Sequence, residues 1–352
     1  MNSSLLRNSL RKLWITFPVL LMIGCGPDEG PEPVAPGEEP ISFSVPNGFP
    51  QPVYSFQNNP LTQEGFELGR KLFYDPILSR DSTVSCGSCH QQSVAFAHAD
   101  HRFSHGIDDL NGTRNSPGLY NLAWFPNFMW DGGVNHLEVQ PLAPITNPVE
   151  MDETMANVLV KLRRNQTYRS LFLSAFDSDS ITTQRVMYAM AQFMGAMVSA
   201  SSRYDQYRQG TGSFSPSEIN GLNLFRTHCE SCHKEPLMTD MQFRNNGLDP
   251  QFASDPGRAM ITGMPQDSGL FRVPSLRNVA LTKPFMHDGR FSSLTQVLNH
   301  YSTGIVQSST LDPHFSNGSI PLTSQDKTDI IAFLYTLTDQ RFISDRRFSE
   351  VQ

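Results

Sequence analysis

Two stretches decide the fold of this chain: Cys86-Gly87-Ser88-Cys89-His90 and Cys229-Glu230-Ser231-Cys232-His233, which together use four of its five cysteines. A Cys-x-x-Cys-His sequence is typical of covalent haem attachment, in which the thiols add to haem vinyl groups and the histidine binds the iron. Zinc is an alternative, because Cys-x-x-Cys pairs also form zinc sites, usually with roughly 15 to 20 residues between the pairs. Here the pairs lie about 140 residues apart, and a histidine follows each one. Two c-type haems are therefore predicted in preference to zinc or disulfides.

The N-terminus has the pattern of a secretion signal. Basic residues precede an apolar run at residues 13–23, which closes on Gly24-Cys25. This pattern resembles a bacterial lipoprotein signal, so residues 1–25 are predicted to form the signal peptide, with lipid attached to Cys25. A transmembrane anchor is the alternative, but the run is shorter than the roughly 20 residues that span a bilayer and contains Pro18.

Residues 26–50, rich in Pro, Gly and Glu, are predicted to form a tether between the lipid and the folded protein. The predicted location is the periplasmic face of a bacterial membrane, which fits c-type haem attachment outside the cytoplasm. Removing the signal deletes three of the 27 basic residues, which leaves 24 against 34 acidic ones and a formal charge of -10. This acidic balance argues against a nucleic-acid partner.

The roughly 300 remaining residues are enough for two domains, predicted at 51–205 and 206–352. Each haem motif follows a helical segment. The first begins at about Thr62, and the second opens with Ser215-Pro216-Ser217-Glu218, a capping box with proline at the first helical position. This weak repeat predicts a mainly α fold of two tandem cytochrome c-like domains, each with one covalently bound c-type haem.

Three further segments complete the outline of the fold. Residues 186–198 form a methionine-rich apolar helix, for which core packing is a better interpretation than iron ligation. Residues 204–215 contain two glycines and mark the expected domain boundary. Residues 326–337 carry apolar residues at helical spacing and predict a terminal helix.

The chain resembles the bacterial di-haem cytochrome c peroxidase and MauG family from about residue 61 to residue 335. Beyond the haem motifs, the resemblance rests on residues 68–76, 114–117, 130–132, 150–151, 274–282 and 285–290. It implies a peroxidase that reduces hydrogen peroxide to water, with electrons from an external donor such as a cytochrome c relayed through the C-terminal haem. The alternatives are a MauG-like, peroxide-dependent oxidase of a partner protein and a non-enzymatic di-haem electron carrier.

The resemblance also implies the residues of the peroxide pocket. In the family, the distal side of the N-terminal haem carries a glutamine and a glutamate ten and twenty residues after a tryptophan, and Trp130, Gln140 and Glu150 keep both spacings. Peroxide reduction needs a proton to leave one oxygen and a proton to reach the other, a role for Glu150 as general acid and base. Gln140 would bind peroxide or orient Glu150, and Trp130 would relay electrons. Taken alone, Trp130 is more often a core aromatic and Glu150 a solvated loop residue.

The sixth ligand of the second haem distinguishes the family's branches. Donor-dependent peroxidases have a methionine fourteen residues after the histidine that matches His287, whereas this chain has Tyr301, as MauG does. Tyr301 shares a helix face with Leu294 and Val297, which favours an inward side chain. His300 and Met286 are rival ligands, and an uncoordinated core tyrosine is a further alternative.

Other ligand assignments come from the same resemblance. His105 is the best placed distal ligand of the first haem, with His98 and His101 nearby, and surface histidines in a mobile loop are the alternative. The resemblance also implies one calcium ion between the domains, bound by Asn115, Thr282 and Pro284 through oxygen atoms. Homodimers occur in the family.

Overall fold

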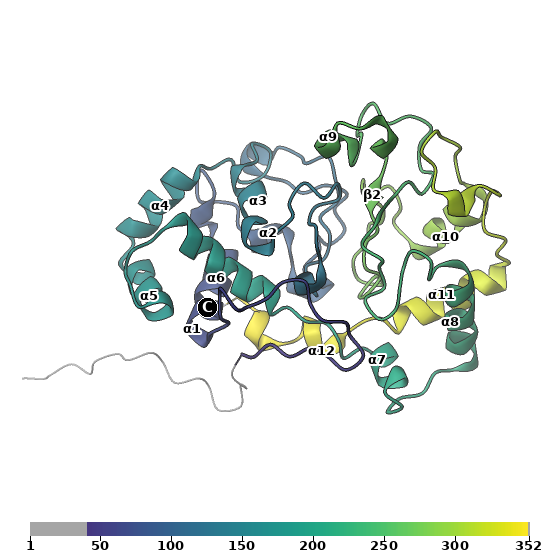
Figure 1. The fold of residues 1–352 in the computed structure, drawn as a ribbon, viewed down its shortest axis with the longest axis horizontal. Helices are drawn as coiled ribbons and strands as arrows, with labels where there is room; N and C mark the ends of the chain where they lie inside the picture. Colours follow the sequence, from purple (N-terminus) through teal and green to yellow (C-terminus); the bar gives the residue numbers. More distant parts are fainter. Residues whose placement is uncertain (1–40, 351–352) are drawn as a thin grey trace, which may run out of the picture. The chain divides into compact units, whose positions relative to one another are not determined.

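The computed structural model describes residues 41–350, which are mainly helical with little strand (Figure 1). The predicted signal peptide, the lipidation site Cys25 and residues 26–40 of the predicted tether lie outside the described residues. None of the described helices is long and apolar enough to cross a membrane.

Twelve α-helices are described between residues 41 and 350. They are α1 (Gln63–Tyr74), α2 (Cys86–Cys89), α3 (Leu142–Thr146), α4 (Met155–Arg164), α5 (Gln166–Phe176), α6 (Thr183–Gly195), α7 (Arg203–Arg208), α8 (Pro216–His228), α9 (Ala259–Thr262), α10 (Leu294–Thr303), α11 (Ser324–Tyr335) and α12 (Gln340–Ile343). Two short strands, β1 (Phe243–Arg244) and β2 (Phe271–Arg272), pair antiparallel. Single 3-10 turns lie at Pro76–Leu78, Gln92–Val94, Ile107–Asp109, Leu122–Trp124, Leu137–Val139, Pro265–Asp267, Pro313–Phe315 and Arg346–Phe348.

The helices expected before the two haem motifs are confirmed. Thr62 caps α1 by accepting a hydrogen bond from the backbone N–H of Gly65. Ser215 and Glu218 form the expected capping box of α8, with Pro216 at the first helical position. Each of these caps satisfies backbone donors that the first helical turn leaves without partners.

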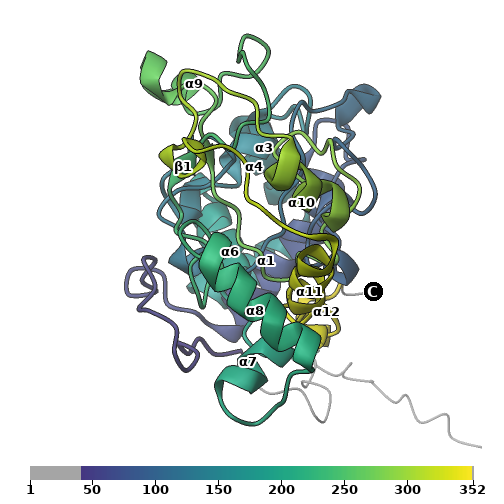
Figure 2. The ribbon, with the colours of Figure 1, turned by 90° about the vertical axis from the view of Figure 1, so that its right-hand side faces the viewer.

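Each of these helices crosses a later helix at a glycine. A Cβ atom at Gly69 of α1 would lie 2.0 Å from the backbone oxygen of Ala189 in α6, and a Cβ at Gly221 of α8 would lie 1.9 Å from that of Asp329 in α11. Both pairs lie side by side in Figures 1 and 2. The same close approach therefore occurs before both motifs, which extends the weak repeat seen in the sequence.

The buried apolar residues form two clusters. The first is built mostly from residues 54–197 and contains the methionines of α6 and its end, with Met190 only 1 % exposed. The second is built from residues 204–337, around Phe225 of α8 and Phe333 of α11. Core packing of the methionine-rich helix is thus confirmed. The helix expected at residues 326–337 is present as α11, but it is not terminal, because α12 follows it. The domain boundary at 205/206 stays a prediction.

The last described residues return to the first cluster. Phe342 of α12 and Phe348 are buried in it, although they follow the second cluster in sequence. Tyr74 donates a hydrogen bond to the backbone oxygen of Phe348 at 2.7 Å, and Gln92 donates one to that of Asp345 at 2.7 Å. The C-terminal segment therefore holds the region around the first haem motif.

Candidate functional site

Both haem motifs line one cavity of about 880 Å³. All six motif side chains with binding chemistry reach it: Cys86, Cys89, His90, Cys229, Cys232 and His233. The cavity is mainly apolar, with polar groups at a few positions, as is usual for a site that binds a large organic cofactor.

The first motif is a single helical turn whose geometry is set locally. Ser85 and Ser88 cap α2 reciprocally, and the backbone N–H of His90 donates to the backbone oxygen of Cys86 at 2.9 Å. The Nδ1 atom of His90 lies 2.6 Å from the backbone oxygen of Phe96, so Nδ1 carries the proton and Nε2 is left for iron. Burial lowers the pKa of His90, which keeps the imidazole neutral, as a metal ligand must be.

The second motif has the same design at the end of α8. His233 is oriented by its Nδ1 atom, which lies 3.2 Å from the backbone oxygen of Met238, and burial lowers its pKa. The four motif cysteines are all free thiols, so the disulfide alternative is wrong. No group of three or more His, Cys, Asp or Glu side chains within residues 41–350 is arranged to hold a metal ion. Paired thiols, an oriented neutral histidine and a shared apolar cavity fit c-type haem at both motifs.

Glu150 lies in the wall of the same cavity and is half-buried. Its carboxylate accepts a hydrogen bond from the side-chain amide of Asn147 at 2.7 Å. Burial raises the pKa of Glu150, while the Asn147 hydrogen bond opposes that rise. The alternative interpretation, in which Glu150 is a solvated loop residue, therefore does not fit its surroundings.

The segment 105–107 packs on the backbone of Glu150. The N–H of Ile107 donates to the backbone oxygen of Glu150 at 2.8 Å, and a Cβ atom at Gly106 would lie 2.2 Å from that of Val149. The sequence did not predict this contact, and only the lone glycine signals it. It places His105, which also lines the cavity, next to the Glu150 loop.

The three histidines of this loop are not equivalent. His105 lines the cavity, and its Nδ1 atom lies 2.9 Å from the Asp109 carboxylate, whereas His98 and His101 are absent from the cavity wall. The rings of His98 and His101 stack with centroids 4.3 Å apart. Of the three, only His105 lines the cavity, and its side chain is 44% exposed, so distal ligation by His105 stays a prediction.

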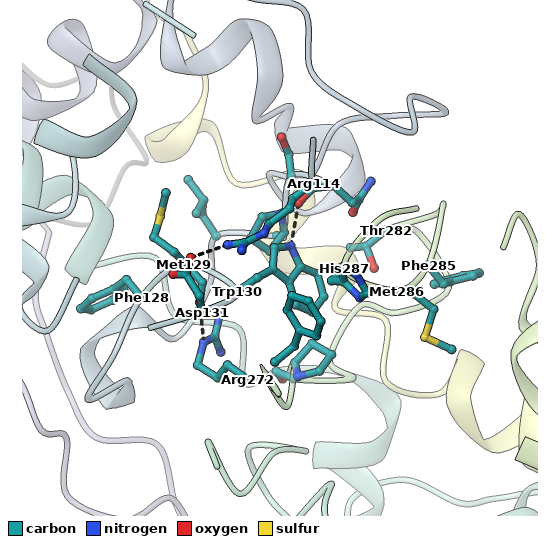
Figure 3. A pocket seen from close by; sticks show the side chains of 18 of the residues that line it. Arg114, Phe128, Met129, Trp130, Asp131, Arg272, Thr282, Phe285, Met286 and His287 are labelled. Atoms are coloured by element: carbon teal, nitrogen blue, oxygen red, sulfur yellow. Dashed lines mark hydrogen bonds and ion pairs between the residues drawn. The ribbon is translucent and has the colours of Figure 1, made fainter. Parts of the chain in front are cut away.

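Trp130 occupies the middle of the group of side chains in Figure 3. Its Nε1–H donates to the backbone oxygen of Asn115 at 2.8 Å, and its ring meets that of His287 edge-on with centroids 6.5 Å apart. His287 in turn stacks on Phe271 at 3.6 Å. Gln140 also lines the cavity, and its amide lies 3.9 Å from the sulfur of Met129, the residue before Trp130.

The residues expected to bind calcium lie in the wall of the same cavity as Trp130. Asn115, Thr282 and Pro284 all line the cavity, although they come from distant parts of the sequence. The amide nitrogen of Asn115 lies 3.3 Å from the backbone oxygen of His101 and 3.4 Å from that of Arg102. Oxygen atoms of the backbone therefore gather at this point.

Tyr301 of α10 and Met286, the alternative ligand of the second haem, both lie near the side-chain amide of Asn246. Asn246 donates to the Tyr301 hydroxyl at 3.2 Å, and the same nitrogen lies 3.4 Å from the Met286 sulfur. Tyr301 and Met286 both line the cavity, whereas His300 does not and its Nε2 atom bonds the backbone oxygen of Asn246 at 2.9 Å. Burial raises the pKa of Tyr301 to about 12. Sequence reasoning missed Asn246, which has no motif to mark it.

A mainly helical fold with two such motifs around one cavity defines a class of protein, the di-haem c-type oxidoreductases. The comparisons with known proteins make the family explicit. Residues 63–213 match the model of the di-haem cytochrome c peroxidase family. The chain is 33% identical over 306 residues to the methylamine utilization protein MauG of Methylophilus methylotrophus, covering 84% of this chain and 87% of that protein. It belongs to this family of enzymes, and the family carries two c-type haems.

Two other similarities mark the breadth of the family. The chain is 32% identical over 286 residues to the cytochrome c551 peroxidase of Nitrosomonas europaea, covering 77% of this chain and 79% of that protein. A crystal structure of a MauG-like protein associated with microbial copper homeostasis is 34% identical, with a TM-score of 0.81, and the match covers 88% of this chain and 99% of that one. Peroxidases and MauG proteins are thus similar to this chain to about the same degree.

Proposed function

We propose that this protein reduces hydrogen peroxide to water at the first haem motif, with electrons that an external donor such as a cytochrome c delivers through the second haem. The observation that carries the proposal is the half-buried Glu150, with its raised pKa, in one cavity with His90. When bound, the haems supply the iron that receives electrons and meets peroxide. The residues of the chain then supply protons and orientation.

Glu150 is the group that moves the protons. A carboxyl whose pKa lies above its ordinary value exchanges a proton more evenly near neutral pH, which suits a group that must both accept and donate. Asn147 holds one carboxylate oxygen and so fixes the direction of the other. Gln140 lines the same cavity, and its proposed role is to bind peroxide or to orient Glu150.

Trp130 is the proposed relay between the two haems. Its ring is fixed at Nε1 by Asn115 and lies against His287, a residue of the loop that also carries Met286. His105 is the proposed distal ligand of the first haem in the resting state; EPR spectra of His105→Ala that equal those of the wild type would exclude it.

The test of the proposed reaction is steady-state peroxide turnover with a reduced donor. Glu150→Gln removes the titrating group with little change of shape, and we expect turnover to fall about 10²- to 10⁴-fold while both haems stay attached. Glu64→Gln, an exposed change outside the cavity, is the matched control and should retain full turnover. Near-normal turnover of Glu150→Gln would refute the role of Glu150.

A MauG-like oxidase of a partner protein is the second candidate, favoured by Tyr301 and by the 33% identity to MauG. The two functions differ in where the electrons come from. Rapid peroxide consumption with a reduced cytochrome supports the peroxidase, whereas consumption only with an oxidisable protein supports the oxidase. If peroxide leaves the Soret band of the protein unchanged, the protein is an electron carrier.

Two features outside the reaction belong to the same proposal. Calcium bound near Asn115, Thr282 and Pro284 would fasten the loops on either side of Trp130, so chelation should alter haem spectra, and metal analysis should find one calcium per chain.

Lipid on Cys25 would hold the protein at the periplasmic face of the membrane, and Cys25→Ser should release it into the soluble fraction.

A further inference from the structure

We infer that Arg272 is a carboxylate-binding residue of the cavity and that its guanidinium binds a propionate of one of the haems beside Trp130. Arg272 ends β2, is only 7 % exposed and lines the cavity that contains both haem motifs. No motif in the sequence singles it out for this role.

Three contacts hold Arg272 in place, one through its backbone and two through its side chain. Its backbone N–H donates to the backbone oxygen of Trp130 at 2.7 Å, and its Nε–H donates to that of Met129 at 3.3 Å (Figure 3). The guanidinium carbon lies 4.6 Å from the ring centre of Phe125. These contacts set the direction of the guanidinium, but none of them supplies a negative charge.

Of the two terminal nitrogens of the guanidinium, Nη1 is buried and has no hydrogen-bond acceptor within residues 41–350. Two other arginines have carboxylate partners: the fully buried Arg277 forms an ion pair with Asp205 at 2.7 Å, and the partly buried Arg114 forms one with Asp255 at 2.7 Å. Arg272 has no ion pair in the described part of the chain. Burying an unpaired charge is costly, so an anion that enters the cavity is expected to complete the site.

The geometry favours a carboxylate as that anion. A planar guanidinium binds a carboxylate through parallel N–H donors, and the two propionates of a c-type haem are the carboxylates that the cofactor of this family brings into the cavity. Burial lowers the pKa of Arg272 to about 10, so the side chain remains mainly charged at neutral pH. A small anion from solvent is the other source of the same chemistry.

The site has a consequence for electron transfer. A positive charge beside a haem disfavours the oxidised form and therefore raises its reduction potential, and it also compensates the negative propionate. Because Arg272 bonds the backbone of both Met129 and Trp130, the same residue links the cofactor to the proposed relay.

The test compares Arg272→Met and Arg272→Lys with Arg341→Met, which removes a positive charge from an exposed position. We expect Arg272→Met to lower the equilibrium constant for reduction of one haem roughly tenfold, which corresponds to a potential lower by about 59 mV for one electron. Arg341→Met should change neither potential. A role limited to packing would lower stability and leave both potentials unchanged, which would overturn the inference.

Arg272→Lys keeps the charge and covers the case in which the methionine variant does not fold. Lysine lacks the fork of donors, so the resonance Raman bending mode of the bound propionate should shift, whereas an unchanged mode would refute the assignment. Potentials of the wild type that vary with chloride at constant ionic strength would show that a solvent anion occupies the site, and this would also refute it.

Discussion

Gly221→Ala tests whether the close crossing of α8 and α11 stabilises the second haem motif. The added Cβ would lie 1.9 Å from the backbone oxygen of Asp329 and 2.9 Å from the Cβ of Phe333, whereas ordinary contact begins at 3.4 Å. The helices would have to separate by about 1.5 Å, the difference between the ordinary and the available distance to that oxygen. Because the obstacle is backbone, no rotamer change can relieve it.

The expected free-energy change follows from two opposing terms. Overpacking of this kind costs about 1–3 kcal/mol, and the clash with backbone places Gly221→Ala near the upper end. Alanine favours a helix over glycine by about 1 kcal/mol. We therefore expect a net destabilisation of about 2 kcal/mol, measured as a lower guanidinium midpoint with an unchanged denaturant slope.

The control for Gly221→Ala is Asn223→Ala, an exposed change on the same helix. It should change stability by less than about 0.5 kcal/mol. Gly69→Ala should match Gly221→Ala, because its Cβ would lie 2.0 Å from the Ala189 oxygen. If Gly221→Ala is as stable as the wild type, the reasoning that the α8–α11 crossing has no room for a side chain at position 221 is refuted.

If Tyr301 binds the second iron, a tyrosinate-to-iron charge-transfer band should be seen optically or by resonance Raman and should vanish in Tyr301→Phe. Haem spectra that Tyr301→Phe leaves unchanged would return the site to a rival ligand such as Met286. Asp205→Asn should cost about 3–5 kcal/mol at pH 7, because it leaves the fully buried Arg277 without its partner. Burial alone would raise the pKa of Asp205, but the hydrogen bonds and charge of Arg277 hold that pKa below its ordinary value. The contribution of Asp205 to stability is therefore present above the unfolded pKa of about 3.9 and is lost as pH falls through the lower folded pKa. Urea unfolding of the wild type and Asp205→Asn should thus converge at low pH, and a constant difference at all pH values would contradict this reasoning.

Local signals in the sequence predicted the local structure well. The caps of α1 and α8 depend on residues within three positions of each other, so Thr62, Ser215 and Glu218 could be assigned directly. The resemblance to a family brought Glu150 and Tyr301 forward, and both line the cavity, although their roles remain predictions.

The features that the sequence did not predict all depend on distant segments. The return of α12 to the first cluster, the contact of Ile107 with Glu150 and the buried guanidinium of Arg272 each join residues with no shared pattern. An arginine beside a phenylalanine in a two-residue strand has no sequence signature of burial. Only the packing of β2 on Met129 and Trp130 gives Arg272 its environment.

A set of hydrogen bonds connects Trp130 with Arg272 and with the loop that carries Met286 and His287. The backbone oxygen of Trp130 accepts from Arg272, its indole donates to Asn115, and the N–H of Asn115 donates to the backbone oxygen of His287 at 2.7 Å. The residue before His287 is Met286, whose sulfur shares the Asn246 amide with Tyr301. Movement of the loop that carries Met286 is therefore expected to disturb the hydrogen bond between the Trp130 indole and Asn115. On the roles proposed above for Tyr301, Met286 and Trp130, a change of the sixth ligand at the second haem is thus expected to move the Trp130 ring as well.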